Sequence, residues 1–85
     1  MSEATPGFGE ITDIDAGRRR LGMTLRDVWV GYFAVGGNGT QAQVGGWLSS
    51  AGRMPARERD LLAQALNDRF TDIGLNHPVR YSDGL

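Results

Sequence analysis

Few residues of this chain have side chains that could do chemistry, and arginine dominates among them. All nine basic residues are arginines, histidine occurs once and cysteine is absent. Asp68 and Asp72 are four residues apart, so in a helix they share a face, where two carboxylates can exchange a proton or hold a cation. His77 has no further ligand at metal spacing and no group to orient it as a base. We therefore expect a protein that is not an enzyme and that holds neither a metal nor a cofactor.

Three arginines, Arg53, Arg57 and Arg59, cluster where a helix is expected to begin. Positive charge at that end opposes the helix macrodipole, at a cost of about 0.3 kcal/mol or more for each side chain. One explanation is ion pairing with the interleaved Glu58 and Asp60, which the sequence favours. The other is an anion, such as a DNA phosphate or an acidic partner segment, held jointly by the arginines and by free backbone N–H groups. These arginines are therefore our candidates for contact with an anion or a nucleic acid.

Residues 24–37 have the pattern of an amphipathic helix with both ends marked. Thr24 and Asp27 are spaced to cap its first turn, while Gly36 and Gly37 suit the left-handed conformation that commonly ends a helix. Between them, apolar side chains recur at intervals of three and four residues, which places them on one helical face. The residues of this face are Leu25, Val28, Trp29, Tyr32 and Phe33.

Two further helices follow in the same manner. Thr40 and Gln43 repeat the capping pair, and Gly52 is the expected end of this second helix. Pro55 suits the first turn of a third helix, which Gly74 would end. The apolar residues at helical spacing are Val44, Trp47, Leu48 and Ala51 in the second helix and Leu61, Leu62, Ala65, Leu66, Phe70 and Ile73 in the third.

The N-terminal stretch, residues 1–22, is expected to be a flexible acidic leader that ends in an arginine cluster at residues 18–20. Its first 15 residues contain four carboxylates and no base, and proline and glycine interrupt any early helix. An alternative is that Ile11 and Ile14, together with Phe8, dock on the helices or pair as a short strand.

The predicted fold is all-α: a small three-helix bundle over residues 23–75, with flexible or extended segments at both ends. Residues 76–85 are expected to form an extended tail, because Pro78 stops helix propagation. Val79 and Tyr81 alternate with polar neighbours, and they could cover the open end of the bundle.

Composition and length indicate one small domain. The 85 residues are 40% hydrophobic and 22% charged, which is ordinary for a globular protein. A core of roughly 50 to 60 ordered residues lies near the lower limit of self-sufficiency, where oligomerisation or a partner often adds burial. No apolar run approaches the roughly 18 residues of a membrane span, and no signal peptide is evident. We expect a cytoplasmic protein, without membrane contact, that forms a homodimer or a complex as readily as a monomer.

The second and third helices invite comparison with the helix-turn-helix family of DNA-binding proteins. With Gly52 as the turn glycine, that family's pattern expects a small residue at Leu48 and apolar residues at Arg53 and Glu58, and none of the three fits. The net charge of −1 and the pI of about 5.6 also weaken attraction to phosphate. Nucleic-acid binding is therefore disfavoured and kept as an alternative.

Three segments, residues 25–29, 32–38 and 66–70, resemble small uncharacterised helical proteins of bacteria with GC-rich genomes. The resemblance covers about two thirds of the chain. It implies a compact helical fold and carries no function.

The leading functional hypothesis is a non-enzymatic helical module, of a regulatory kind, that binds another protein or itself. Trp29, Tyr32 and Trp47 are the expected interface anchors, because aromatic side chains supply a large contact area at low rotamer cost. The competing interpretation places each of these rings in the core, since a short domain needs its large side chains inside. The alternative function is a small DNA-binding regulator that uses Arg53 and Arg57 together with Arg59.

Overall fold

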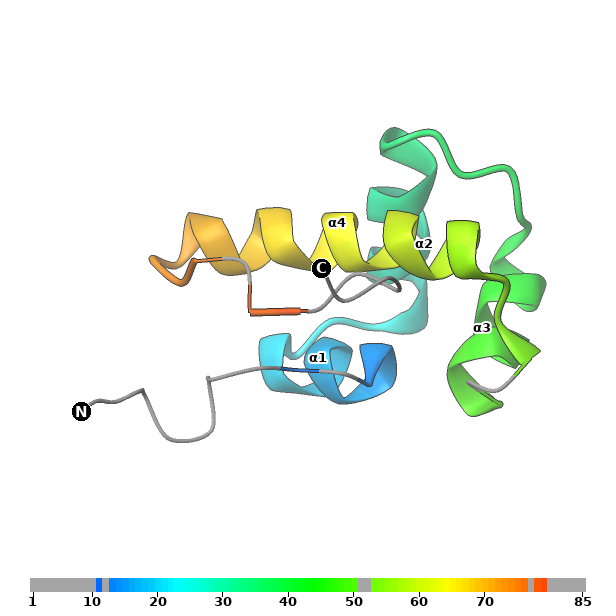
Figure 1. Cartoon of the computed structure of the whole chain (residues 1–85), viewed down its shortest axis with the longest axis horizontal. Helices are drawn as coiled ribbons and strands as arrows, with labels where there is room; N and C mark the ends of the chain where they lie inside the picture. Colours follow the sequence, from blue (N-terminus) through cyan, green and yellow to red (C-terminus); the bar gives the residue numbers. More distant parts are fainter. Residues whose placement is uncertain (1–10, 12, 51–52, 77, 80–85) are drawn as a thin grey trace.

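The chain forms four helices within the part that the structure, a computed structural model, describes: residues 11, 13–50, 53–76 and 78–79 (Figure 1). They are α1 (Ile14–Leu21), α2 (Leu25–Ala34), α3 (Gln41–Ser49) and α4 (Ala56–Asp72). The all-α class is confirmed. The prediction of three helices is wrong by one, because α1 lies in the stretch that was expected to be a flexible leader.

α1 forms because its charges match a helix of eight residues. The Asp13 side chain caps its start by accepting a hydrogen bond from the backbone N–H of Asp15 at 3.1 Å. The Asp15 carboxylate pairs with Arg18 at 2.7 Å and with Arg19 at 2.6 Å, one turn further along. Gly22 ends the helix in the left-handed conformation, with φ at 69°. The arginine cluster at residues 18–20 is therefore the last turn of a helix. Positive side chains are stabilising there, because they interact favourably with the negative end of the helix macrodipole.

The predicted start and end of α2, the start of α3 and the end of α4 are found. α3, however, ends at Ser49 with Ser50 as its C-cap, before the predicted end at Gly52, and Pro55 is the N-cap of α4 rather than a residue of its first turn. Both capping boxes are present, with reciprocal side-chain to backbone hydrogen bonds. They pair Thr24 with Asp27 and Thr40 with Gln43. After α4, Gly74 has φ at 90°, and the N–H of Leu75 donates to the carbonyl of Phe70 at 2.9 Å, which is the predicted Schellman stop. Ala51 and Gly52 lie outside the described residues.

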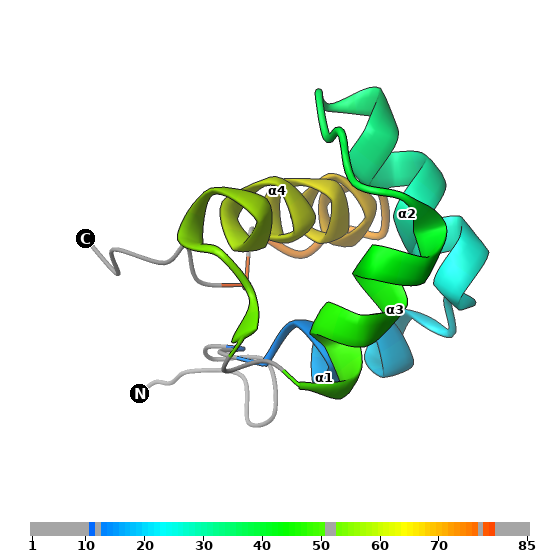
Figure 2. The ribbon, with the colours of Figure 1, turned by 90° about the vertical axis from the view of Figure 1, so that its right-hand side faces the viewer.

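α4 is the central element of the fold. It packs against α2 and α1, while α3 packs mainly against α2. Figure 2 looks almost along the axis of α4 and shows the other three helices gathered around one side of it. Neither α4, with 17 residues, nor any other helix of the described part has the length and the apolar content to cross a membrane.

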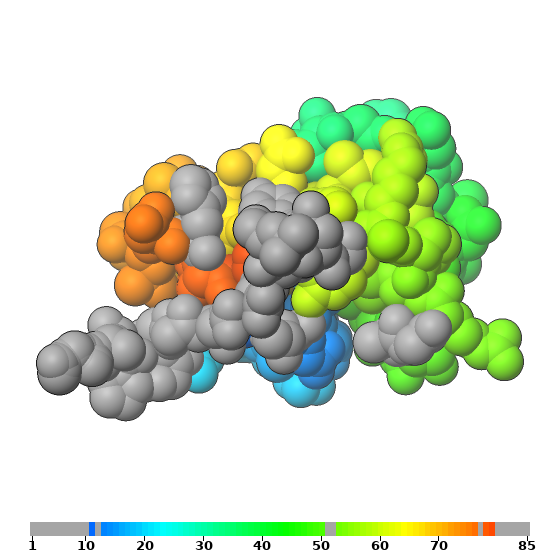
Figure 3. Space-filling model, viewed as in Figure 1, coloured from blue at the N-terminus to red at the C-terminus, as the bar shows by residue number. Residues whose placement is uncertain are grey.

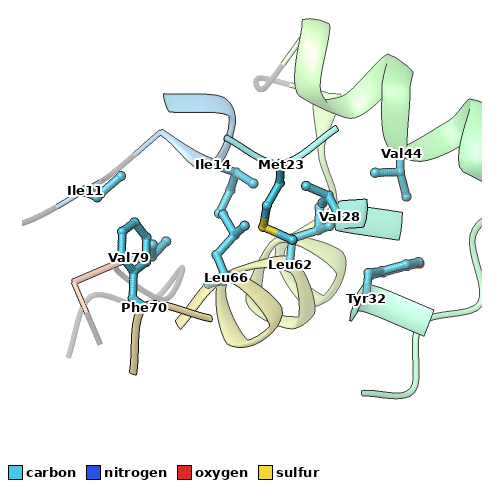
Figure 4. Packing of buried hydrophobic residues seen from close by; sticks show 11 residues of the cluster. Ile11, Ile14, Met23, Val28, Tyr32, Val44, Leu62, Leu66, Phe70 and Val79 are labelled. Atoms are coloured by element: carbon cyan, nitrogen blue, oxygen red, sulfur yellow. The ribbon is translucent and has the colours of Figure 1, made fainter. Parts of the chain in front are cut away.

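The core is a continuous apolar layer contributed by all four helices. It extends from Ile11 and Val79 at one end to Val44 and Tyr32 at the other (Figure 4). Each such side chain contributes roughly 1.5 to 3 kcal/mol when it is fully removed from water. The helical residues that are almost completely buried in this layer are Ile14, Val28, Tyr32, Val44, Leu62, Leu66 and Phe70.

The two ends of the described chain meet over α1 and α4. Ile11 and Val79 form an isolated parallel bridge, in which the N–H of Ile11 donates to the carbonyl of Pro78 at 2.8 Å. Asn67, which is fully buried on α4, holds Val79 by two hydrogen bonds: its amide donates to the carbonyl at 2.9 Å and accepts from the N–H at 2.8 Å. Docking of Ile11 and Ile14 on the helices is thus confirmed, as is burial of Val79. The other residues of those two predictions, Phe8 and Tyr81, lie outside the described residues.

Candidate protein-binding site

α2 is apolar around its whole circumference beyond its first turn. Its charged residues are Arg26 and Asp27, both near its start. A surface helix normally turns a polar face to solvent, and a helix that is apolar all round is normally buried on every side. Val28 and Tyr32 form the face of α2 that packs in the core. The opposite side of α2 therefore exposes apolar residues to water.

We call the outward residues Trp29, Val30, Phe33 and Ala34 the outer face of α2. Val30 is 49% exposed and Phe33 is 62% exposed. The half-buried ring of Trp29 lies beside Phe33, with ring centroids 5.8 Å apart, and its indole N–H donates inward to the carbonyl of Gly39 at 3.0 Å. Because that donor is satisfied within the domain, the ring can offer apolar surface without leaving a polar atom unpaired.

A surface groove of about 330 Å³ lies between α2 and α4 and continues the outer face of α2. Its apolar lining includes Val30 and Ala34, and it reaches down to Gly31 and Ala65. A Cβ on Gly31 would lie 3.3 Å from the Cβ of Ala65, so small residues let the two helices approach closely here. Six of the ten lining residues are exposed, which makes this an open groove rather than an enclosed cavity. We call it the α2–α4 groove.

Figure 3 shows part of the seam between these helices, with teal atoms of α2 beside the yellow atoms of α4 along the upper edge.

The rim of the α2–α4 groove is acidic. Asp27 from α2 and Asp68 and Asp72 from α4 line it, with Arg69 as the one lining cation, for a formal charge of −2. The pKa of Asp27 is lowered, first by the hydrogen bond from the Thr24 backbone and, to a smaller extent, by the charge of Arg69. Asp68 and Asp72 therefore lie on the same face of α4, as their spacing in the sequence predicted. Both carboxylates are exposed beside the apolar floor of the groove.

The structure places Tyr32 in the core. Its side chain is fully buried, and its hydroxyl donates to Glu58 Oε1 at 2.5 Å and accepts from the N–H of Gly39 at 2.8 Å. A Cβ added to Gly37 would lie 2.3 Å from the ring, so the loop after α2 packs directly on it. Burial, followed by the hydrogen bond to Glu58, raises the pKa of the phenol. The interface role predicted for this residue is corrected by its position, because a ring enclosed on all sides offers no surface to a partner.

Trp47 occupies an intermediate position. It is half-buried against the core, and its ring meets Tyr32 edge-on, with centroids 6.2 Å apart and planes at 75°. The ring of Trp47 packs on Tyr32, which is fully buried, so the three predicted anchors do not form one exposed cluster. Its partial exposure keeps it on the surface near the loop after α2.

The arginines near the start of α4 differ in their surroundings. Arg57 pairs with Glu58 at 3.0 Å, as the ion-pair interpretation predicted for that residue. Arg53 and Arg57 are exposed and Arg59 is half-buried. α3 and α4 are separated by residues 50–55 and are not a principal packing pair, unlike the two helices of a helix-turn-helix, which meet across a turn of about three to four residues.

A metal centre finds no support in the part of the chain that is described. Among residues 11, 13–50, 53–76 and 78–79, no group of three or more histidine, cysteine, aspartate or glutamate side chains could hold an ion. His77 lies outside that part.

Known proteins supply no model for this site. The chain matches no protein-family model, no curated protein and no solved structure. Its function must be inferred from the surface itself.

Sequence reasoning missed the groove and two residues of the outer face, Val30 and Ala34. Their signal was available, because no charged residue occurs from Val28 to Gly39. The apolar periodicity of α2 identifies a single face and does not separate its buried residues from its exposed ones: Phe33 is on that face and is 62% exposed, while Val30 and Ala34 lie off it.

Proposed function

We propose that this protein works by binding another protein, or a second copy of itself, through the outer face of α2, and that it catalyses no reaction. The observation that carries the proposal is the apolar character of α2 on the side turned to water. Apolar area removed from water contributes about 25 cal/mol per Å², so covering Phe33 and Val30 favours association. Exposed apolar patches on a small domain are typical of interaction sites.

Trp29 is the anchor that best combines position and chemistry. Its ring lies against Phe33 at the surface, and the hydrogen bond to Gly39 fixes the ring before any partner arrives. A side chain that is already ordered loses little rotamer freedom on binding, which lowers the cost of association.

The test compares the wild type with a Val30→Ser/Phe33→Ser variant. Both positions are exposed, so the variant should keep its helicity, with a stability change within about 0.5 kcal/mol. Light scattering over a concentration series measures self-association, and retention of proteins from the native lysate on the immobilised chain measures binding to others. We expect the double variant to lose the dimer, or the retained partner, that the wild type shows.

Ile73→Ser is the matched control, because Ile73 is 64% exposed but lies at the end of α4. It removes a comparable apolar surface at another place and should leave association unchanged. The proposal is wrong if the wild type is monomeric and retains the same proteins as the double variant.

A further inference from the structure

We propose that the occupant of the α2–α4 groove is an amphipathic helix of a different protein, with arginine or lysine beside its apolar stripe. This inference rests on the proposed function, since it names the partner of the same surface. It is argued from the shape of the groove and from the charge of its rim.

The groove suits a helix by its size and its floor. On α2 its lining runs from Asp27 to Ala34, a rise of about 10 Å at 1.5 Å per residue, which is roughly two helical turns. The floor is lowered where α2 and α4 cross, because Gly31 and Ala65 carry little or no side chain there. Apolar side chains that recur on one face of a helix can enter such a groove one turn after another.

The rim determines which helix fits. Asp68 and Asp72 lie in the C-terminal part of α4, where negative charge opposes the macrodipole. Within the described residues, no ion pair or hydrogen bond of either carboxylate is found, so only the charge of Arg69, in the same turn, offsets their position. Asp27 adds a third carboxylate on the opposite wall, and like any exposed aspartate it is charged at neutral pH. A partner with guanidinium or ammonium groups on its flanks would complement this field.

The same charge disfavours the other occupants. In a twofold dimer each groove would face its own copy, which places two rims of formal charge −2 against each other. A head-to-tail contact between copies would escape that repulsion, but unless its rotation closed a ring it would build an open chain of molecules. A nucleic acid would be repelled by the rim.

The probe is a synthetic peptide of about 16 residues, with leucines at helical spacing on one face and arginines beside them. A second peptide carries glutamates in place of the arginines. Binding to the full chain is followed by titration and by amide chemical shifts, at about 50 mM and about 300 mM salt. We expect the arginine peptide to shift Val30, Gly31 and Ala34, and to bind about tenfold more tightly than the glutamate peptide at the lower salt concentration.

Three variants locate the binding on the groove. Asp68→Asn/Asp72→Asn should weaken the arginine peptide about fivefold and reduce its salt dependence. Gln41→Lys/Gly46→Lys makes the same change in net charge at exposed positions of α3, where a Cβ on Gly46 meets no atom within 4 Å, and it should change affinity less than about twofold. Ala34→Trp adds bulk at an exposed edge of the groove and should weaken binding about tenfold or more.

Equal affinity for the two peptides, or shifts that map away from Val30 and Ala34, would overturn the inference. So would light scattering that shows association of the chain with itself abolished by Ala34→Trp. The proposed function is judged separately by the Val30→Ser/Phe33→Ser variant, and it survives if that variant loses a partner whose binding is insensitive to salt.

Discussion

α1 and α2 both pack against α4, yet their outward sides are opposite in character. On α1, the Asp15 carboxylate is held by Arg18 and Arg19 at less than 3 Å, and the arginines meet solvent. On α2, the corresponding side is apolar, with Val30 and Phe33 about half or more exposed. The two helices have similar lengths, of 8 and 10 residues, and share the same neighbour.

The difference teaches that the apolar outer face of α2 is not required by the fold. Packing on α4 needs one apolar side per helix, and α1 shows that the other side can be fully polar. Exposed apolar residues also carry a risk of non-specific association, which natural surfaces tend to keep low. Their presence on α2 is the observation behind the partner proposed above.

The largest expected effect lies on the α1 side, where Asn67 holds Val79 beside Ile11. Asn67→Ala would leave the buried N–H and carbonyl of Val79 without their partner, and each such group costs about 1 to 3 kcal/mol. We expect a loss of about 3 kcal/mol in the free energy of unfolding, measured with urea. Gln64→Ala, at an exposed position of the same helix, should change it by less than about 0.5 kcal/mol. If both variants changed the free energy of unfolding equally, the hydrogen bonds between Asn67 and Val79 would not stabilise the fold.

The inner side of α2 should respond next. Tyr32→Phe removes the hydroxyl that links Glu58 to Gly39, and we expect a loss of about 1 to 2 kcal/mol in urea unfolding. The raised pKa of Tyr32 adds a pH dependence: its contribution is complete below the unfolded value of 10.0 and is lost as pH rises through the folded pKa. The wild type should therefore weaken at alkaline pH more than the variant does. If the stability of the wild type and that of Tyr32→Phe fell in parallel as pH rises, the pH dependence would not come from the Tyr32 hydroxyl.

The outward side of α1 should matter less. Asp15→Asn breaks two ion pairs near the surface, which we expect to cost less than about 1 kcal/mol and to be partly masked by salt. Thermal unfolding at low and high ionic strength measures this. If Asp15→Asn lost as much stability as Asn67→Ala, the surface ion pairs of α1 would matter to the fold as much as the buried hydrogen bonds of Asn67. That result would contradict the contrast drawn here.

The smallest effect concerns the first turn of α2. The pKa of Asp27 is lowered from 3.8, chiefly by hydrogen bonds with Thr24, so its contribution is present above that value and is lost as pH falls through the folded pKa. Asp27→Asn should slightly lower the neutral part of the stability curve and leave its acid end unchanged, so that the acid limb becomes flatter. An acid limb identical to that of the wild type would show that the cap carries no charge-dependent stability.

The parts of the fold that sequence predicted are those set by neighbours along the chain. Thr24 with Asp27 and Thr40 with Gln43 cap their helices within one turn, so spacing alone identifies them. The signals of α1 are also local, with Asp13 as its cap and Gly22 at its end, but with only eight residues it is too short for an apolar periodicity to stand out.

The candidate site could be predicted only in part. Trp29 is half-buried and packs beside the exposed Phe33, whereas the burial of Tyr32 depends on Glu58 and the loop at Gly39, which no periodicity reveals. The acidic rim forms only because α2 and α4 cross near Gly31, which brings Asp27 to the same groove as carboxylates some 40 residues later.

The unfolding free energy of the Val30→Ser/Phe33→Ser variant tests the central claim most directly, because that claim separates the outer face of α2 from the forces that hold the fold. It is measured in urea at a concentration where the wild type is monomeric, since association would add its own stability. We predict a value within about 0.5 kcal/mol of the wild type. A loss of about 2 kcal/mol or more, as buried side chains produce, would show that these residues belong to the core and contradict the account.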